Sequence, residues 1–242
     1  LNEAGTIAVN AVIDVSRGLG GATDGTIGLK ASGNITEDAV TGGLTGDTDG
    51  KLVAHSTGGS INLATKANNA MKTAAFKTDT AVGTNGTITY KDSSDLTIDT
   101  VAAAGTLTSP SGGTAAGTVG PVSGITTVAG TTDGAVIVES GGLLTVNQAI
   151  STTPGAAAAG GAVTLEATTG GITLANVGTI TSTGNGANAG GEVYLHNIGA
   201  GDITIGQAIT AKGGAGGVGG NVTVLNEAGT IAVNAVIDVS RG

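Results

Sequence analysis

Alternating apolar residues recur along this chain, each time directly after a glycine. Seven segments have this form: GTIGL at 25, GKLVA at 50, GTITY at 86, GAVIV at 134, GAVTL at 161, GEVYL at 191 and GNVTV at 220. Successive side chains of a strand point to opposite faces, so the alternation predicts short strands with one apolar face. Val, Ile and Thr suit such half-buried strands, and the glycine density disfavours helices. The chain is therefore predicted to be all-β.

Three consecutive units, at 162–191, 192–220 and from 221 onward, share one internal order. Each unit contains three strand-like pieces and includes a glycine-rich loop. In the last unit one side of the strands carries only apolar residues: Val222, Val224, Ile231, Val233, Ile237 and Val239. A propeller blade needs four strands and about 40 residues, whereas these units have about 30 residues and three strands. The pattern favours a three-sided coil of parallel strands.

The chain also contains a longer period. Residues 225–242 repeat residues 1–18 without a difference, as LNEAGTIAVNAVIDVSRG, at an offset of 224 residues. The coil units within this period start near 26, 51, 87, 135, 162, 192 and 221. Repeats of this length are typical of solenoids. We expect residues 1–242 to form a single solenoid segment of about seven coils, with each strand stacked on its equivalents and residues 225–242 beginning the next period.

Two stretches depart from the pattern. Residues 91–134 correspond either to one coil with a long lateral excursion, which we favour, or to two degraded coils. Residues 67–81 form the only passage with helical character. We expect a short helix there, with Met71 and Phe76 covering a patch beside the core.

Composition supports a thin and regular interior. The chain has 46 Gly, no Cys and three aromatic residues, Phe76, Tyr90 and Tyr194. Bulky aromatic side chains normally fill irregular cores, so columns of Val and Ile must do that here. The formal net charge of −9 argues against nucleic-acid partners and against binding to anionic membranes. No apolar run of 18 residues is present, so no membrane insertion is expected.

Residues 160–184 (GGAVTLEATTGGITLANVGTITSTG) and 201–224 (GDITIGQAITAKGGAGGVGGNVTV) resemble the repeats of filamentous-haemagglutinin-like proteins. These are large bacterial exoproteins of two-partner secretion and related autotransporter passengers. The likeness covers nearly the whole chain and rests on low-complexity patterns. It implies a right-handed parallel β-helix, exported and folded outside the cell, in a family of adhesins and fibres. The amino-terminal secretion domain of that family has no counterpart in these residues.

Candidate catalytic chemistry is sparse. The two histidines, His55 and His196, are far apart in sequence, so a shared acid–base pair or metal site is not expected. No G-x-S-x-G motif occurs. Enzymes on β-helices need clustered carboxylates or bases, and the nine Lys and Arg residues are scattered. We expect neither an enzyme nor a bound cofactor.

Calcium is the best small-ligand candidate. Asp47 and Asp49 in GDTDG, and Asp92 and Asp95 in KDSSD, offer closely spaced oxygen ligands. The alternative is turn chemistry, because Asp before Gly is common in tight turns. The repeated nonapeptide of calcium-binding rolls is not present, so these four aspartates are weak candidates for structural calcium.

Two functions remain open. The favoured one is a structural repeat of a long extracellular or bacterial cell-surface fibre, whose partners are copies of itself placed end to end. The alternative is an adhesin module that binds a glycan or a partner cell through loops near 66–85 and 110–134. The identity of the two terminal segments favours the structural function.

Overall fold

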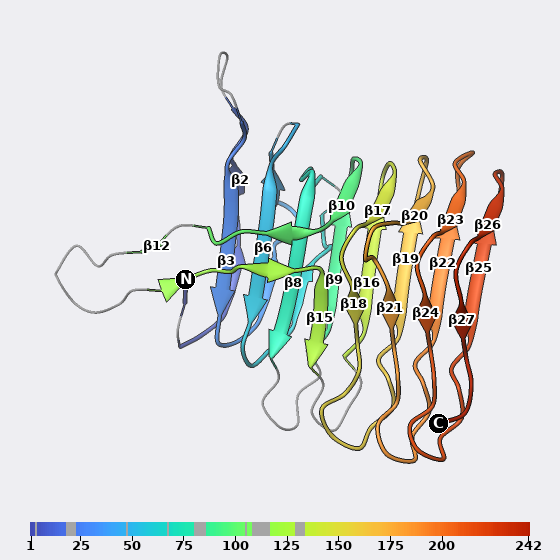
Figure 1. Cartoon of the computed structure of the whole chain (residues 1–242). Helices are drawn as coiled ribbons and strands as arrows, with labels where there is room; N and C mark the ends of the chain where they lie inside the picture. Colours follow the sequence, from blue (N-terminus) through green and yellow to red (C-terminus); the bar gives the residue numbers. More distant parts are fainter. Residues whose placement is uncertain are drawn as a thin grey trace.

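The computed structural model describes residues 1–2, 4–17, 23–46, 48–66, 68–79, 86–104, 106–107, 117–128 and 134–242. Parallel strands stack into a β-solenoid of about seven turns, with the two termini at opposite ends of the stack (Figure 1). The described residues contain strands and turns but no helix. The prediction of an all-β parallel solenoid is confirmed.

The carboxy-terminal coils are regular. Each contributes one strand to each of three columns. The first column holds β16 (Val136–Ser140), β19 (Val163–Ala167), β22 (Val193–Asn197) and β25 (Val222–Asn226). The second holds β17 (Leu144–Val146), β20 (Ile172–Leu174), β23 (Ile203–Ile205) and β26 (Ile231–Val233). The third holds β18 (Ile150–Ser151), β21 (Ile180–Thr181), β24 (Ile209–Thr210) and β27 (Ile237–Asp238). Equivalent residues stack in register, so aliphatic side chains fill the interior.

The amino-terminal coils use a different order of faces. Their opening strands are long and form a column of β3 (Thr26–Ala31), β6 (Lys51–Ser56) and β8 (Thr73–Asp79). Their second strands, β1 (Ile7–Val9), β4 (Ile35–Glu37) and β7 (Ile61–Leu63), stack beneath β9 (Ile88–Asp92) and so join the column of β16. A third column pairs β2 (Val12–Asp14) with β5 (Gly43–Thr45). The opening strands of the first two units therefore do not stack on those of the later units, contrary to expectation.

The change of order takes place at β8. Its first two residues pair with β10 (Leu96–Ile98), and its last four pair with β15 (Ile125–Val128). One long column thus divides into the two short columns that run through the later coils. The prediction of a short helix within 67–81 is wrong, because residues 73–79 form this strand. Alternation places Phe76 inside, and Met71 and Phe76 are fully buried in the main core rather than on a patch beside it.

The irregular stretch is one coil with an excursion. Two short antiparallel pairs leave and return to the stack, β11 (Thr100–Val101) with β14 (Val122–Ser123) and β12 (Thr106–Leu107) with β13 (Gly117–Thr118). Figure 1 shows the β12 strand projecting away from the coils. The excursion covers the outer face of β6 and β8 with a second small core: Val53, Ala75, Val101, Val119 and Val122.

The structure corrects part of the loop expectation. Within the loop expected near 66–85, residues 73–79 form the strand β8, which lies inside the sheet. The range 110–134 includes three strands, β13 to β15. Residues 80–85, 108–116 and 129–133 lie outside the described residues.

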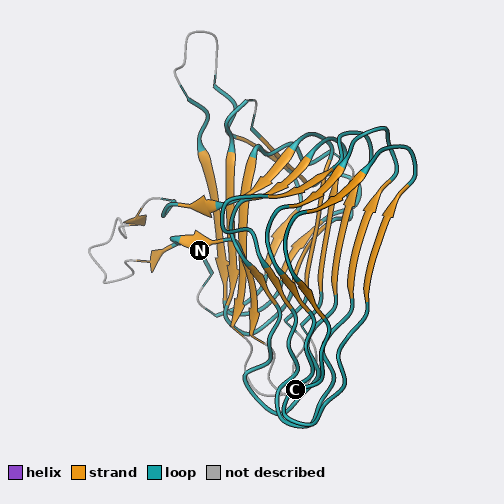
Figure 2. Ribbon diagram, turned by 45° about the vertical axis from the view of Figure 1, so that its right-hand side comes forward, coloured by secondary structure: helices purple, strands orange, loops and turns teal. Residues whose placement is uncertain are grey.

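The glycine-rich loops are ordered by the backbone of neighbouring coils. Figure 2 shows the loops running side by side along one edge of the solenoid. Gly160 N–H donates to Ala189 O at 3.0 Å, and Gly190 N–H donates to Val218 O at 3.0 Å. A Cβ on Gly191 would lie 2.5 Å from the carbonyl oxygen of Gly161, the equivalent glycine one coil earlier. Glycine is required at this position because the backbones approach too closely for a side chain.

Candidate functional site: side-chain clusters and end coils

The two histidines lie in different sheets. His55 is on β6, and its Nε2 lies 2.6 Å from Oδ2 of Asp79. His196 is on β22, in the eight-stranded sheet. Each histidine is next to carboxylates of neighbouring coils, and the structure does not bring the two together in one sheet.

His196 bridges three successive coils. Its Nδ1 lies 3.1 Å from Glu166 Oε2, and its Nε2 lies 3.0 Å from Glu227 Oε1. The hydrogen bond to Glu227 is the largest cause of a raised His196 pKa, and Glu166 adds to it. When protonated, the ring donates to both carboxylates, so it links β22 to both adjacent coils. This bridge links neighbouring coils, and its contacts do not require a substrate.

Asp92 is occupied by hydrogen bonds inside the solenoid. The Tyr90 hydroxyl donates to Asp92 Oδ2 at 2.6 Å, and the Met71 N–H donates to the same oxygen at 2.8 Å. Ser94 donates to Oδ1 through both its N–H and its hydroxyl. Burial raises the pKa of the Asp92 carboxyl, although these donors oppose the effect. Both carboxylate oxygens therefore accept hydrogen bonds that stabilise the corner of this coil.

Asp49 lies in a bend between β5 and β6. Asp49 exchanges hydrogen bonds with Asp24: each backbone N–H donates to the partner's carboxylate, at 2.7 and 2.9 Å. The N–H of Asp49 is the largest cause that lowers the Asp24 pKa to about 2. This reciprocal contact fixes two turns of adjacent coils. Asp47 lies outside the described residues.

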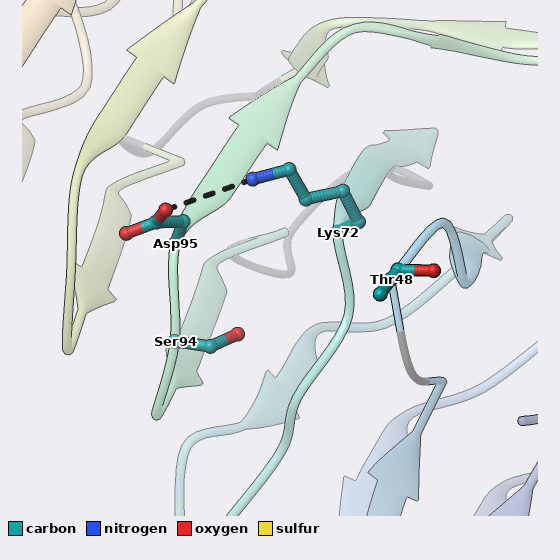
Figure 3. Close-up of a pocket in the computed structure, with 4 residues that line it drawn as sticks. All are labelled: Thr48, Lys72, Ser94 and Asp95. Carbon is teal, nitrogen blue, oxygen red and sulfur yellow. Dashed lines mark ion pairs between the residues drawn. The ribbon is translucent and has the colours of Figure 1, made fainter.

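Asp95 lies beside a shallow depression (Figure 3). The depression has a volume of about 240 Å³, and four residues line it: Thr48, Lys72, Ser94 and Asp95. Asp95 accepts a hydrogen bond from the Leu143 N–H at 2.8 Å and lies 3.7 Å from Lys72 Nζ. Across the described ranges, no group of three or more His, Cys, Asp or Glu residues is placed to hold a metal ion. Structural calcium stays a prediction.

A buried acidic residue was missed by the sequence analysis. Glu37 is 6% exposed, inside the solenoid, and its Oε2 accepts a hydrogen bond from Asn69 Nδ2 at 3.2 Å. The same amide donates to Leu63 O and Lys91 O, and Asn69 Oδ1 accepts from the Leu44 N–H. The alternation of β4 indicates that Glu37 points inward, two residues after Ile35. Asn69 thus links several coils at one corner through hydrogen bonds.

Polar side chains form columns on the outer faces. One column carries threonine in successive coils: Thr97, Thr145, Thr173 and Thr204. A second column carries Thr126, Ser151, Thr181 and Thr210. These columns depend on the register between coils, which the pattern of a single unit does not reveal.

The last coil presents an apolar end face. Ile231 and Val233 point along the same inward column as Ile203 and Ile205, yet they are 45% and 52% exposed. Ile203 and Ile205, one coil further in, are fully buried. Apolar side chains of an end coil, with unpaired strand edges beside them, form a template for pairing with another chain segment. Ile231 and Val233 thus continue the register of the buried residues in the coil before them.

Comparison with family models, with curated proteins and with solved structures finds no match for this chain. Within the described ranges, no helix is long and apolar enough to cross a membrane.

Proposed function

We propose that this chain is a length of shaft from a long extracellular fibre or giant bacterial surface protein. In this function, coils of successive 224-residue units stack end to end. The proposal rests on one observation: residues 225–242 are identical to residues 1–18, and β26 and β27 continue the register of the coils before them. A following copy of the sequence would continue the same stack.

The internal architecture supports a load-bearing element. Hydrogen-bonded parallel ladders continue through all seven steps of the eight-stranded sheet. A stack of this kind gains stability mainly from the interfaces between neighbouring coils, so added coils extend it without a new core design. The outer side-chain clusters around His196 and Asp49 also link adjacent coils.

The resemblance to filamentous-haemagglutinin-like exoproteins gives the proposal its location. Repeats of this kind occur in proteins that are exported and form fibres on the bacterial surface. By analogy, the fibre would lie outside the cell, and copies of the same sequence would be its direct neighbours.

Electron microscopy of the native material tests this function. We expect unbranched rods many times longer than one 224-residue unit. With a spacing of about 4.8 Å between stacked strands, one unit would advance the rod by about 34 Å. Discrete particles about 35 Å long would overturn the proposal.

A second candidate function is an adhesin module. The excursion of β11 to β14 lies on the outside of the solenoid and has its own small core. In this function the excursion would contact a glycan or a partner cell, and the coils would only present it. Binding of the chain to a glycan array, abolished by replacing residues 102–119 with a short glycine-serine linker, would favour this function.

A further inference from the structure

The two copies of LNEAGTIAVNAVIDVSRG occupy different places in the solenoid. In the first copy, β1 stacks on β4 in the eight-stranded sheet, and β2 stacks on β5. In the second copy, β26 and β27 stack on β23 and β24 in the thirteen-stranded sheet. The same eighteen residues therefore pair with a following coil in one case and with a preceding coil in the other.

The described residues of the two copies nevertheless share two local turns. Asn2 Nδ2 donates to Thr6 O at 3.0 Å, and the equivalent Asn226 Nδ2 donates to Thr230 O at 2.8 Å. A second turn also repeats: the Ser16 N–H donates to Asp14 Oδ1 at 2.8 Å, and the equivalent Ser240 N–H donates to Asp238 Oδ1 at 2.9 Å. The described residues of the segment thus form similar turns at both ends.

The inward residues also match. Ile7 pairs with Ile35, and the equivalent Ile231 pairs with Ile203. Ile13 pairs with Leu44, and the equivalent Ile237 pairs with Ile209. Leu44, Ile35, Ile203 and Ile209 are all fully buried, so both copies point the same side chains into the interior.

The backbone groups used in the two copies do not overlap. Outside the strand ladders, the first copy bonds the following coil through Asn2, Gly5, Ile7, Val9 and Val15. The second copy bonds the preceding coils through Glu227, Thr230, Asn234, Val236, Asp238, Ser240 and Gly242. Shifted by 224 residues, the first set corresponds to Asn226, Gly229, Ile231, Val233 and Val239. In a parallel sheet, alternate residues bond alternate neighbours, so one segment can carry both sets at once.

We propose that this eighteen-residue segment is the seam coil between consecutive 224-residue units of one polypeptide. Its partner is a second, covalently following copy of this sequence, in a defined register. Ile231 and Val233 would stack on the next unit's Ile35 and Glu37, and Ile237 on its Leu44. This inference rests on the proposed function and adds the register by which one unit joins the next.

The register extends to residues before the segment. Asn2 pairs with Ala31, so the preceding Val224 and Val222 would lie over Leu29 and Ile27 of the next unit. Those two residues are 7% and 4% exposed, whereas their partners in the next coil, Ala54 and Leu52, are fully buried. Among the described residues, β3 has a strand partner on its β6 side, and the isolated bridge from Asn2 reaches only its last residue. At the seam, Val222 and Val224 would cover the remaining exposed surface of Ile27 and Leu29.

The seam also accounts for the two orders of faces. The strand β26 of one unit has the same Ile-Ala-Val sequence as β1, which stacks on β4. At the seam the column of β23 and β26 would therefore continue into the next unit's column of β4 and β7. The column of β22 and β25 would continue into β3 and β6. At β8 the long column then divides and restores the order of the later coils.

Engineered disulfides test the seam directly, because the chain contains no cysteine. The test protein has two 224-residue units in tandem, followed by residues 225–242. Asn221→Cys in the first unit and Thr26→Cys in the second would be register partners on the outer surface. The positive control is Thr26→Cys with Lys51→Cys in a single unit, whose positions pair in the structure. The negative control combines Glu192→Cys in the first unit with Thr26→Cys in the second, two coil steps apart.

We expect the seam pair to oxidise to the same extent as the positive control, and the negative control to remain reduced. A seam pair that stays reduced while the positive control oxidises would overturn the inference. NMR hydrogen exchange of the tandem protein without cysteines gives a second readout: the amides of Ile231 and Val233 should exchange at least tenfold more slowly at the internal seam than in the last segment. Equal exchange at both places would also overturn it. Neither result depends on whether the native protein forms fibres.

Discussion

The carboxy-terminal and amino-terminal coils reach a filled core in different ways. From β16 onward, Val, Ile and Leu stack on their equivalents, and the core contains no aromatic ring. Around β8 and β9, where the order of faces changes, the core holds Met71, Phe76 and Tyr90, with the two rings 5.0 Å apart. Regular stacking needs only small branched residues, whereas a change in cross-section needs large side chains to fill the irregular space.

The largest effect should come from emptying the switch region. Phe76→Ala removes a fully buried ring where one column divides into two, and we expect a loss of about 3–5 kcal/mol in the free energy of unfolding. Ile172→Val, in a regular coil, should cost only about 0.5–1.5 kcal/mol. Urea unfolding, followed by circular dichroism, measures both. Equal losses would show that the two regions do not differ in the way described.

A glycine exchange distinguishes the two halves by backbone contact. A Cβ on Gly191 would lie 2.1 Å from Ser182 Oγ and 2.4 Å from Gly160 O, so Gly191→Ala should cost about 1–3 kcal/mol. A Cβ on Gly43, on β5 in the amino-terminal half, would have Asn68 Nδ2 as its nearest neighbour, at 3.4 Å, which is an ordinary van der Waals contact. Gly43→Ala should therefore cost less than about 1 kcal/mol. Thermal unfolding that ranks Gly43→Ala as the more damaging change would contradict this difference.

The polar contact within the switch region should have an intermediate effect. Tyr90→Phe removes the hydroxyl that donates to the buried Asp92, and we expect a loss of about 1–2 kcal/mol. Tyr194→Phe, on the outer face of β22, is the matched control and should change stability by less than about 0.5 kcal/mol. Chemical denaturation of both variants provides the comparison, and indistinguishable midpoints would count against a structural role for the Tyr90 hydroxyl.

The smallest effect should appear in the regular half and depend on pH. The raised pKa of His196 means that its contribution is fully present below about pH 6.5 and is lost as pH rises through the folded-state value. Because Glu227 is half exposed, the contribution should be only about 0.5 kcal/mol. Unfolding of His196→Gln between pH 5.5 and 9 should lack this pH dependence, whereas Glu192→Gln should keep it. A wild-type protein that gains stability over this range would show the opposite sign.

Some of this architecture was predictable from sequence, because it depends on local patterns. The alternation in segments such as GAVTL and GEVYL predicts the strands and their inward residues correctly. The order of faces in the first coils was not predictable in this way, since β3 and β9 have the same local pattern but join different sheets. Their placement depends on long-range pairing. Phe76 illustrates the same limit, because helix-compatible residues around it form a buried strand when neighbouring strands pair on both sides.

The candidate clusters were less accessible to prediction. The partners of His196, Glu166 and Glu227, lie 30 and 31 residues away in sequence, at about one coil in each direction. Their proximity follows from the register between coils, which a single unit does not reveal. Asp92 was recognised as an oxygen-rich position, but its burial and its Tyr90 partner depend on the fold of the switch region.

The proposed seam makes consecutive 224-residue units one continuous solenoid. Cryo-electron microscopy of a protein with several units in tandem measures this most directly, through the axial advance per unit. With seven strand steps of about 4.8 Å, we expect an unbroken rod that advances about 34 Å per unit, with no gap at LNEAGTIAVNAVIDVSRG. Separate bodies joined by a flexible linker at that segment would contradict it.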